Sequence, residues 1–190
     1  MLSYQLDVES AGSASLLNVA AFANPFTYQL KIATGSVGES RAVNVDLVET
    51  FNYLLGLRVS HADAFYISRK KAQKAHKGGE AKALAEEISF VSSALFCGQT
   101  ASDHKIQVVV GVSPAGEKVL VLWRNTLAVA NGDLDEFFQK QGYNTKDMEF
   151  AVIYVNGDNN LENLKRADET WKVRRTEDEF KRLMFDVQDV

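Results

Sequence analysis

Two apolar runs joined by a short turn constrain the fold of this chain more than any other feature. They are KIQVVVGV at residues 105–112 and EKVLVLW at 117–123, and Pro114 and Gly116 in the intervening SPAG supply turn geometry. Val and Leu follow one another in both runs without a polar alternation, which is typical of strands covered on both faces. The runs therefore predict strands of an α/β domain, with either two or three layers.

The segment VDLVETFNYLLGL, at residues 45–57, has the apolar period of an amphipathic helix. Asp46 and Glu49 form a capping box at its start, and Gly56 suits the position just after its end. Its apolar side chains share one face. We expect this helix to be a core element, in which Asp46 and Glu49 serve only as caps.

Two more helices and one more strand complete the expected order. A helix is predicted from Asp133 through Lys140, closed by Gly142, and a last helix follows a capping box of Thr176 and Glu179. Its inward residues are predicted to be Phe180, Leu183 and Met184. The predicted class is α/β: a small mixed sheet with flanking helices, with strands near residues 58–67, 106–112, 118–123 and 150–155, the last parallel to 118–123 through a crossover.

At 190 residues the chain is predicted to form one main domain with an appendage. Residues 1–43 read as short strands and loops that pack on this domain, in YQLDVES, FTYQLKI and RAVNV. Residues 44–190 form the α/β domain itself. It carries an insertion at about 68–104, which we interpret as two helical pieces hinged at Gly78 and Gly79.

The insertion holds a basic run within a chain whose formal net charge is −4. That balance provides no overall positive field, so any contact with nucleic acid must be local. On a helix, Lys70, Lys74 and Lys77 would share one face and follow phosphates, whereas a merely solvated helix face is the competing interpretation. The candidate nucleic-acid or partner contacts are Arg69, Lys70, Lys71, Lys74 and Lys77.

Other motifs provide no catalytic, cofactor-binding or metal-binding residue. Asn24-Pro25-Phe26 lacks the second proline of the N-P-P-F motif of amino-methyltransferases, and no F-x-G-x-G loop is present to bind S-adenosylmethionine. GVSPAG lacks the glycine spacing of a nucleophile elbow. Asp158 lies in a turn sequence, NGD. A single cysteine and three dispersed histidines have no zinc-site spacing; these are Cys97, His61, His76 and His104.

The helix, strand, strand, helix, strand order resembles the PD-(D/E)-x-K nuclease fold. In that fold, acids on two strands bind a divalent metal, and a lysine lies two residues after the second acid. Here Glu117 begins the second strand without a lysine two residues later. A nuclease-like enzyme that depends on Glu117 therefore stays only as an alternative.

Four stretches together resemble the C-terminal region of the modification (Mod) subunit of type III restriction–modification systems, a family of adenine-specific DNA methyltransferases. In order, they are YQLDVESAGSASLLNVAAFANPFTYQLKI, VDLVETFNYLLGL, GEKVLVLWRN and EFKRLMF, with VIYVNGD between the last two. The resemblance covers most of the chain outside about 68–104.

The resemblance implies that this chain is the C-terminal part of a longer site-specific DNA methyltransferase. The S-adenosylmethionine loop and the D/N-P-P-Y motif lie upstream in that family, so the cofactor belongs to the full-length parent and we expect this part to be inactive alone. Expected partners are a second Mod subunit, the restriction subunit, and DNA through the parent. An N-terminus with Asp7 and Glu9, and no apolar run of about 20 residues, predict a cytoplasmic protein without a membrane span.

Overall fold

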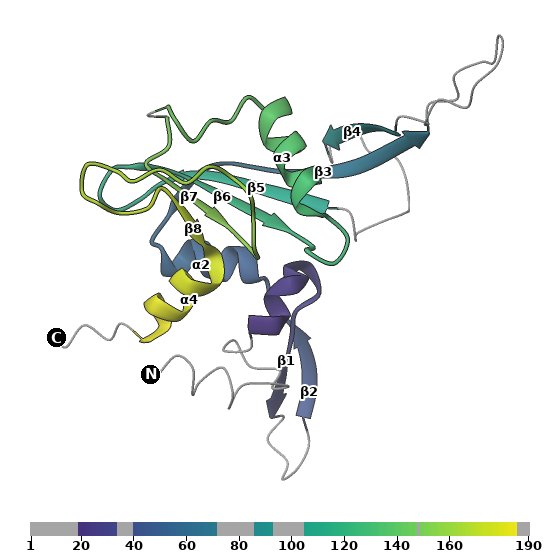
Figure 1. The fold of residues 1–190 in the computed structure, drawn as a ribbon. Helices are drawn as coiled ribbons and strands as arrows, with labels where there is room; N and C mark the ends of the chain where they lie inside the picture. Colours follow the sequence, from purple (N-terminus) through teal and green to yellow (C-terminus); the bar gives the residue numbers. More distant parts are fainter. Residues whose placement is uncertain (1–18, 34–39, 72–85, 93–104, 148, 186–190) are drawn as a thin grey trace.

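The chain folds into three layers, with helices on both faces of a mixed sheet. The computed structural model describes residues 19–33, 40–71, 86–92, 105–147 and 149–185. Within them, one helix lies on one face of the sheet and two helices lie on the other (Figure 1). This arrangement confirms the predicted α/β class and the prediction that the sheet is covered on both sides.

The large sheet is mixed, as predicted, and contains the four predicted strands. Its strands are β3 (Arg58–Lys71), β4 (Glu86–Ser92), β5 (Lys105–Val112), β6 (Lys118–Arg124), β7 (Val152–Val155) and β8 (Val173–Arg175). They lie side by side in the order β4-β3-β5-β6-β7-β8. The strands from β4 to β6 pair antiparallel, whereas β7 runs parallel to β6, as predicted, and β8 runs parallel to β7. The short strand β8 was not predicted.

Strand β6 is the centre of the molecule, because its side chains enter a different core on each face. Its residues from Val119 to Arg124 are all buried. Val119, Val121 and Trp123 pack on the side of the two helices, and Leu120 and Leu122 pack on the side of the single helix. Successive side chains of a strand point to opposite faces, so an unbroken apolar run is what this position requires.

Helix α2 (Leu47–Leu54) is the core element that the sequence predicts. The Asp46 side chain caps it by accepting a hydrogen bond from the Glu49 amide at 3.0 Å. Gly56 follows its end with φ +60°, a left-handed conformation that favours glycine. Phe51 is fully buried, whereas Tyr53 on the opposite face is 83% exposed. The helix therefore presents one face to the sheet and one to solvent.

The other helices are α3 (Asn131–Lys140) and α4 (Thr176–Phe185). The Asp133 carboxylate accepts a hydrogen bond from the Ala130 amide at 3.0 Å, and Phe180 packs inward, as predicted. The capping box of Thr176 is wrong, because its buried hydroxyl has no hydrogen-bond partner among the described residues. No helix in the described part of the chain is both long and apolar enough to cross a lipid bilayer.

The predicted helical insertion is wrong wherever the structure describes it. Residues 68–71 continue strand β3, and residues 86–92 form β4, which pairs antiparallel with β3 from Phe65 to Lys71. Phe90 of β4 contacts Phe137 of α3, with ring centroids 5.1 Å apart. Pairing with a long neighbouring strand and this contact override the helical spacing of the apolar residues. Residues 72–85 and 93–104 lie outside the described part.

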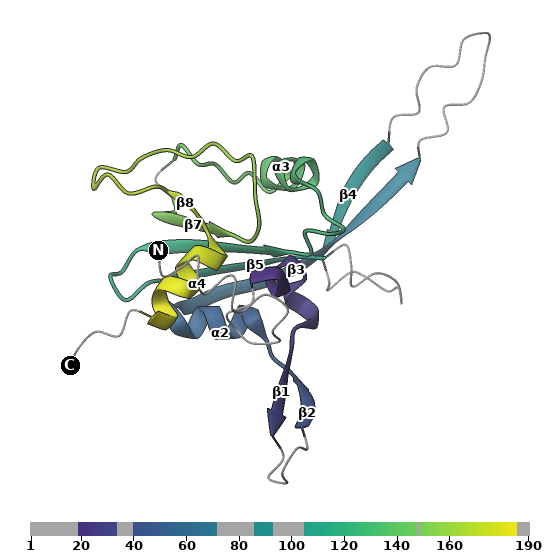
Figure 2. The same cartoon turned by 60° about the horizontal axis from the view of Figure 1, so that its bottom comes forward.

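Two of the three predicted N-terminal strands form a separate hairpin. Strands β1 (Gln29–Ala33) and β2 (Ser40–Asn44) pair antiparallel, after the 3-10 turns η1 (Val19–Ala23) and η2 (Pro25–Thr27). The predicted strand YQLDVES lies outside the described residues. The β1–β2 hairpin points away from the sheet, and the β3–β4 hairpin leaves the sheet in another direction (Figure 2).

Candidate functional site

The stretches that carry the resemblance meet in one buried aromatic cluster. Phe51 of α2 lies 5.7 Å from Trp123 of β6, 5.3 Å from Tyr154 of β7 and 6.0 Å from Phe180 of α4, measured between ring centroids. Phe22, from the first stretch, lies 6.1 Å from Trp123 and 5.2 Å from Phe180. Edge-to-face and stacked rings at these distances stabilise a core beyond the area they bury.

This aromatic cluster has no group that titrates near neutral pH. Burial, followed by the neighbouring Glu179 carboxylate, raises the pKa of the Tyr154 hydroxyl to about 12. That hydroxyl donates a hydrogen bond to Glu179 Oε1 at 3.3 Å. The cluster holds the domain together and offers no acid, base or nucleophile.

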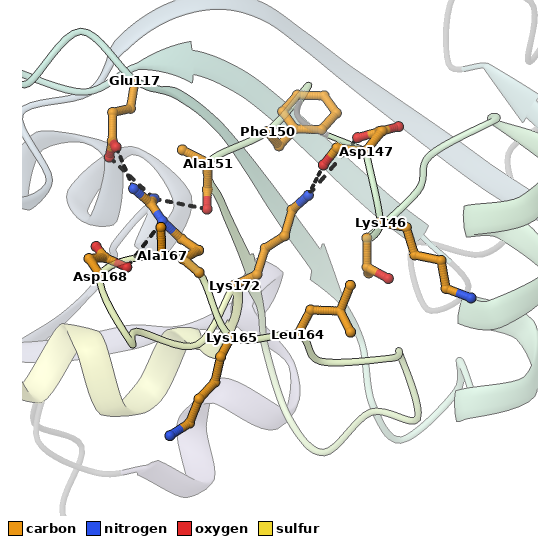
Figure 3. Close-up of a pocket in the computed structure, with 12 residues that line it drawn as sticks. Glu117, Lys146, Asp147, Phe150, Ala151, Leu164, Lys165, Ala167, Asp168 and Lys172 are labelled. Carbon is orange, nitrogen blue, oxygen red and sulfur yellow. Dashed lines mark hydrogen bonds and ion pairs between the residues drawn. The ribbon is translucent and has the colours of Figure 1, made fainter.

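A cleft of about 450 Å³ opens beside the start of β6, between the loops at 145–151 and 164–172 (Figure 3). Arg166 organises one side of it. Its guanidinium Nη2 lies 2.6 Å from Glu117 Oε1, and Nη1 donates to the Ala151 carbonyl at 3.0 Å. Its Nε lies 3.5 Å from Asp168 Oδ1. The hydrogen bond with Glu117 raises the pKa of Arg166 further above its ordinary range.

Lys172 forms the floor of the same cleft. Its side chain is 7% exposed, and its ammonium donates to the Asp147 carbonyl while the Asp147 carboxylate lies 4.0 Å away. Its backbone bridges two elements, since the amide donates to the Leu164 carbonyl and the carbonyl accepts from the Ile153 amide. Phe150 and Leu164 line the cleft as apolar neighbours (Figure 3).

The charged groups of this cleft mostly pair with one another. Both oxygens of Glu117 contact Arg166, at 2.6 and 3.5 Å. A carboxylate held in this way is not free to bind a metal, and no group of three His, Cys, Asp or Glu side chains suited to a metal ion was found in the described part of the chain. The nuclease-like alternative, which depends on Glu117, gains no support from this geometry.

The five candidate basic residues do not share a helix face. Arg69, Lys70 and Lys71 lie on strand β3, where their register partners on β4 are Ile88, Glu87 and Glu86. The structure describes this register for the backbone, and it places the three residues along one strand rather than on a helix. Lys74 and Lys77 lie outside the described residues. That these residues contact nucleic acid or a partner protein stays a prediction.

A buried polar network at the carboxyl ends of β6 and β7 was not predicted. Asn156 is fully buried; its side-chain oxygen accepts from the Arg124 amide at 2.7 Å, and its nitrogen donates to the carbonyls of Arg124 and Phe22. Arg124 is also buried and donates to the carbonyls of Val129 and Asp158. The sequence signal that could have predicted this network is the presence of polar residues at the ends of two apolar strands. In the structure, these residues connect neighbouring loops by hydrogen bonds.

Burial acts on the charged groups of this network. Desolvation lowers the pKa of Arg124, and desolvation raises the pKa of the Glu177 carboxyl. Glu177 Oε1 accepts from the Gly157 amide at 2.7 Å, whereas its buried Oε2 has no hydrogen-bond partner among the described residues. Asp158, the candidate acid of the turn, points its carboxylate to Arg175, 3.4 Å away.

Comparisons of the chain with protein-family models, with curated proteins and with solved structures find no match.

Proposed function

We propose that this chain is a non-catalytic C-terminal module of the Mod subunit of a type III restriction–modification system. It serves subunit assembly, through contact with a second Mod subunit or with the restriction subunit. Methyl transfer to adenine, and the binding of S-adenosylmethionine, belong to the rest of the parent protein.

One observation carries the proposal: each of the five stretches named in the resemblance contributes at least one ring to the same buried core. These rings include Phe22, Phe51, Trp123, Tyr154 and Phe180, and Tyr28 of the first stretch lies in this core as well. Segments that are distant in sequence and meet in one core form a single packing unit. This packing supports a role of the described parts of these stretches in folding the module.

The surface also supports a role in contact. Large apolar side chains are strongly exposed at three separate places: Tyr53 on α2 is 83% exposed, Leu127 in the loop after β6 is 81% exposed, and Trp171 before β8 is 51% exposed. Aromatic residues are enriched at interfaces, where a few of them dominate the binding energy. These side chains are the first positions to test for contact with another subunit.

The test has two parts. The purified chain should neither bind S-adenosylmethionine in calorimetry nor transfer a methyl group to adenine in duplex DNA. A tagged copy should co-purify with Mod or restriction subunits, and at least one of Tyr53→Asp, Leu127→Asp and Trp171→Asp should reduce that recovery. Asn160→Ala, at an exposed loop position, is the matched control. Methyl transfer by the chain alone, or failure of the wild-type chain to associate with either subunit, would overturn the proposal.

A second candidate function is an accessory module that contacts the DNA backbone through the β3–β4 hairpin. The observation that favours it is the basic end of β3, at Arg69, Lys70 and Lys71. Reversing these three charges to Glu should lower DNA affinity and reduce the slope of log affinity against log salt by about one for each phosphate that the variant no longer neutralises. Glu86→Gln with Glu87→Gln should have the opposite effect. If DNA binding is unchanged both in the charge-reversal variant and in the Glu→Gln variant, the basic end of β3 is only a solvent-exposed surface.

A further inference from the structure

A second cleft, of about 410 Å³, lies where the β1–β2 hairpin meets the start of β5. It is at the opposite end of β6 from the cleft of Arg166, because β5 begins beside the last residues of β6. Its lining includes a ring, a cation, three side-chain amides and one carboxylate, from Phe26, Lys105, Gln29, Asn44, Gln107 and Asp46. A cation beside an aromatic ring and amides is a combination that suits nucleic acid.

Lys105 is the central group of this cleft. Its ammonium lies 4.4 Å from the centroid of the Phe26 ring, and no hydrogen bond or ion pair is found for it among the described residues. Burial lowers the pKa of Lys105, and the charge of the Asp46 carboxylate, which lines the same cleft, opposes that effect. Asp46 is occupied in capping α2. The three ammonium donors of Lys105 are thus available to an anion that enters the cleft.

The β1–β2 hairpin extends this site outward. Gln29 pairs with Asn44 in the register, their side chains are joined by a hydrogen bond of 2.7 Å, and both line the cleft. Side chains two positions apart share one face of a strand, so the exposed Lys31 lies on the same face as Gln29. Neither β1 nor β2 contains an acidic residue.

We propose that this cleft is a binding site for a backbone phosphate of DNA, in which Lys105 contacts the phosphate and Lys31 the next one along the β1–β2 hairpin. The amides of Gln29, Asn44 and Gln107 donate to phosphate or sugar oxygens. Such contacts position a strand without reading its sequence. The site is separate from the β3–β4 hairpin and stands whether or not the module serves subunit assembly.

The experiment measures binding of a fluorescent 20-base-pair duplex to the whole chain, by anisotropy at several salt concentrations. Lys105→Gln should weaken binding severalfold at low salt and lower the slope of log affinity against log salt by about one. Lys31→Gln should lower this slope by a similar amount. Lys105→Arg keeps the charge and should retain most of the affinity. The matched control is Lys165→Gln, which removes an exposed lysine near the other cleft, and it should leave the slope unchanged.

Competition with inorganic phosphate and with AMP identifies the source of the phosphate. If phosphate and AMP displace the duplex no better than a simple salt at the same ionic strength, the result supports a DNA backbone site. Tight binding of AMP or phosphate at Lys105 without DNA binding would overturn the proposal. Equal salt slopes for the wild type, Lys105→Gln and Lys165→Gln, with unchanged melting temperatures, would also overturn it, and so would a wild-type chain that does not bind the duplex. None of these outcomes bears on co-purification with Mod or restriction subunits, so the two proposals fail separately.

Discussion

The body of the sheet and the β3–β4 hairpin are held by different interactions. Along β6, side chains enter a core on each face, and the strand has a neighbour on both sides. Among the described residues, strand β3 pairs with β5 as far as Tyr66, and its register partners beyond that point are on β4. The hairpin then extends away from the layers of the domain (Figure 2).

This difference separates folding from binding. A two-stranded ribbon is marginally stable by itself, so the hairpin depends on a few anchors, such as the contact of Phe90 with Phe137. The body, in contrast, unites the five rings and the buried polar network. Changes in the body should therefore act on the free energy of unfolding, and changes in either projecting hairpin should act mainly on binding.

The largest expected effect is that of Phe51→Asp. Phe51 is fully buried and contacts three rings of the cluster, so an unpaired carboxylate there should lower the free energy of unfolding by about 4 kcal/mol or more. Tyr53→Asp, on the exposed face of the same helix, should change it by less than about 0.5 kcal/mol. Urea unfolding followed by tryptophan fluorescence measures both. A larger loss for Tyr53→Asp than for Phe51→Asp would mean that α2 presents the opposite face to the sheet.

A smaller effect is expected in the hairpin. Phe90 is half-buried, so Phe90→Ala should lower the free energy of unfolding by roughly 1–2 kcal/mol, less than for a fully buried ring. Hydrogen exchange should show faster opening of β4 and the outer part of β3, with β6 amides unchanged. Phe90→Leu, which keeps apolar volume, should be closer to the wild type. Loss of protection throughout β6 would show that hairpin and body unfold as one unit.

The smallest expected effect is a pH dependence of the free energy of unfolding that comes from Glu177, in the buried polar network of the body. Burial raises the pKa of Glu177 above its ordinary value of 4.5, so the folded chain holds this proton to a higher pH than the unfolded chain does. The free energy of unfolding contributed by Glu177 therefore falls as pH rises from about 4.5 through the raised pKa. Glu177→Gln should remove this slope and be relatively more stable at pH 7 than at pH 4, as measured by urea unfolding. The same slope in both proteins would contradict the raised pKa.

Local patterns were sufficient for much of the body. The apolar runs of β5 and β6, the turn at Gly116 and the helices α2 and α3 are predicted by signals within a few residues of each other. The cap of Asp46 on the Glu49 amide is one such signal, and the left-handed Gly116, with φ +83°, is another. The cleft of Arg166 and Lys172 was not predicted, since its polar groups come together from separate loops.

The sequence by itself determined which segments are apolar on one face or on both, and so the class of the fold and its central strands. Tertiary structure decided the rest, because long-range partners overrode local signals. The apolar spacing at 84–95 favours a helix, yet Phe65 to Lys71 supply a strand for residues 86–92 to pair with. Thr176 has the sequence of a cap, yet the Glu179 carboxylate turns to Tyr154 and Arg182. Each outcome involves at least one residue about 20 or more positions away in the chain, Phe65 to Lys71 in the first case and Tyr154 in the second, and the positions of these partners are set only when the layers pack.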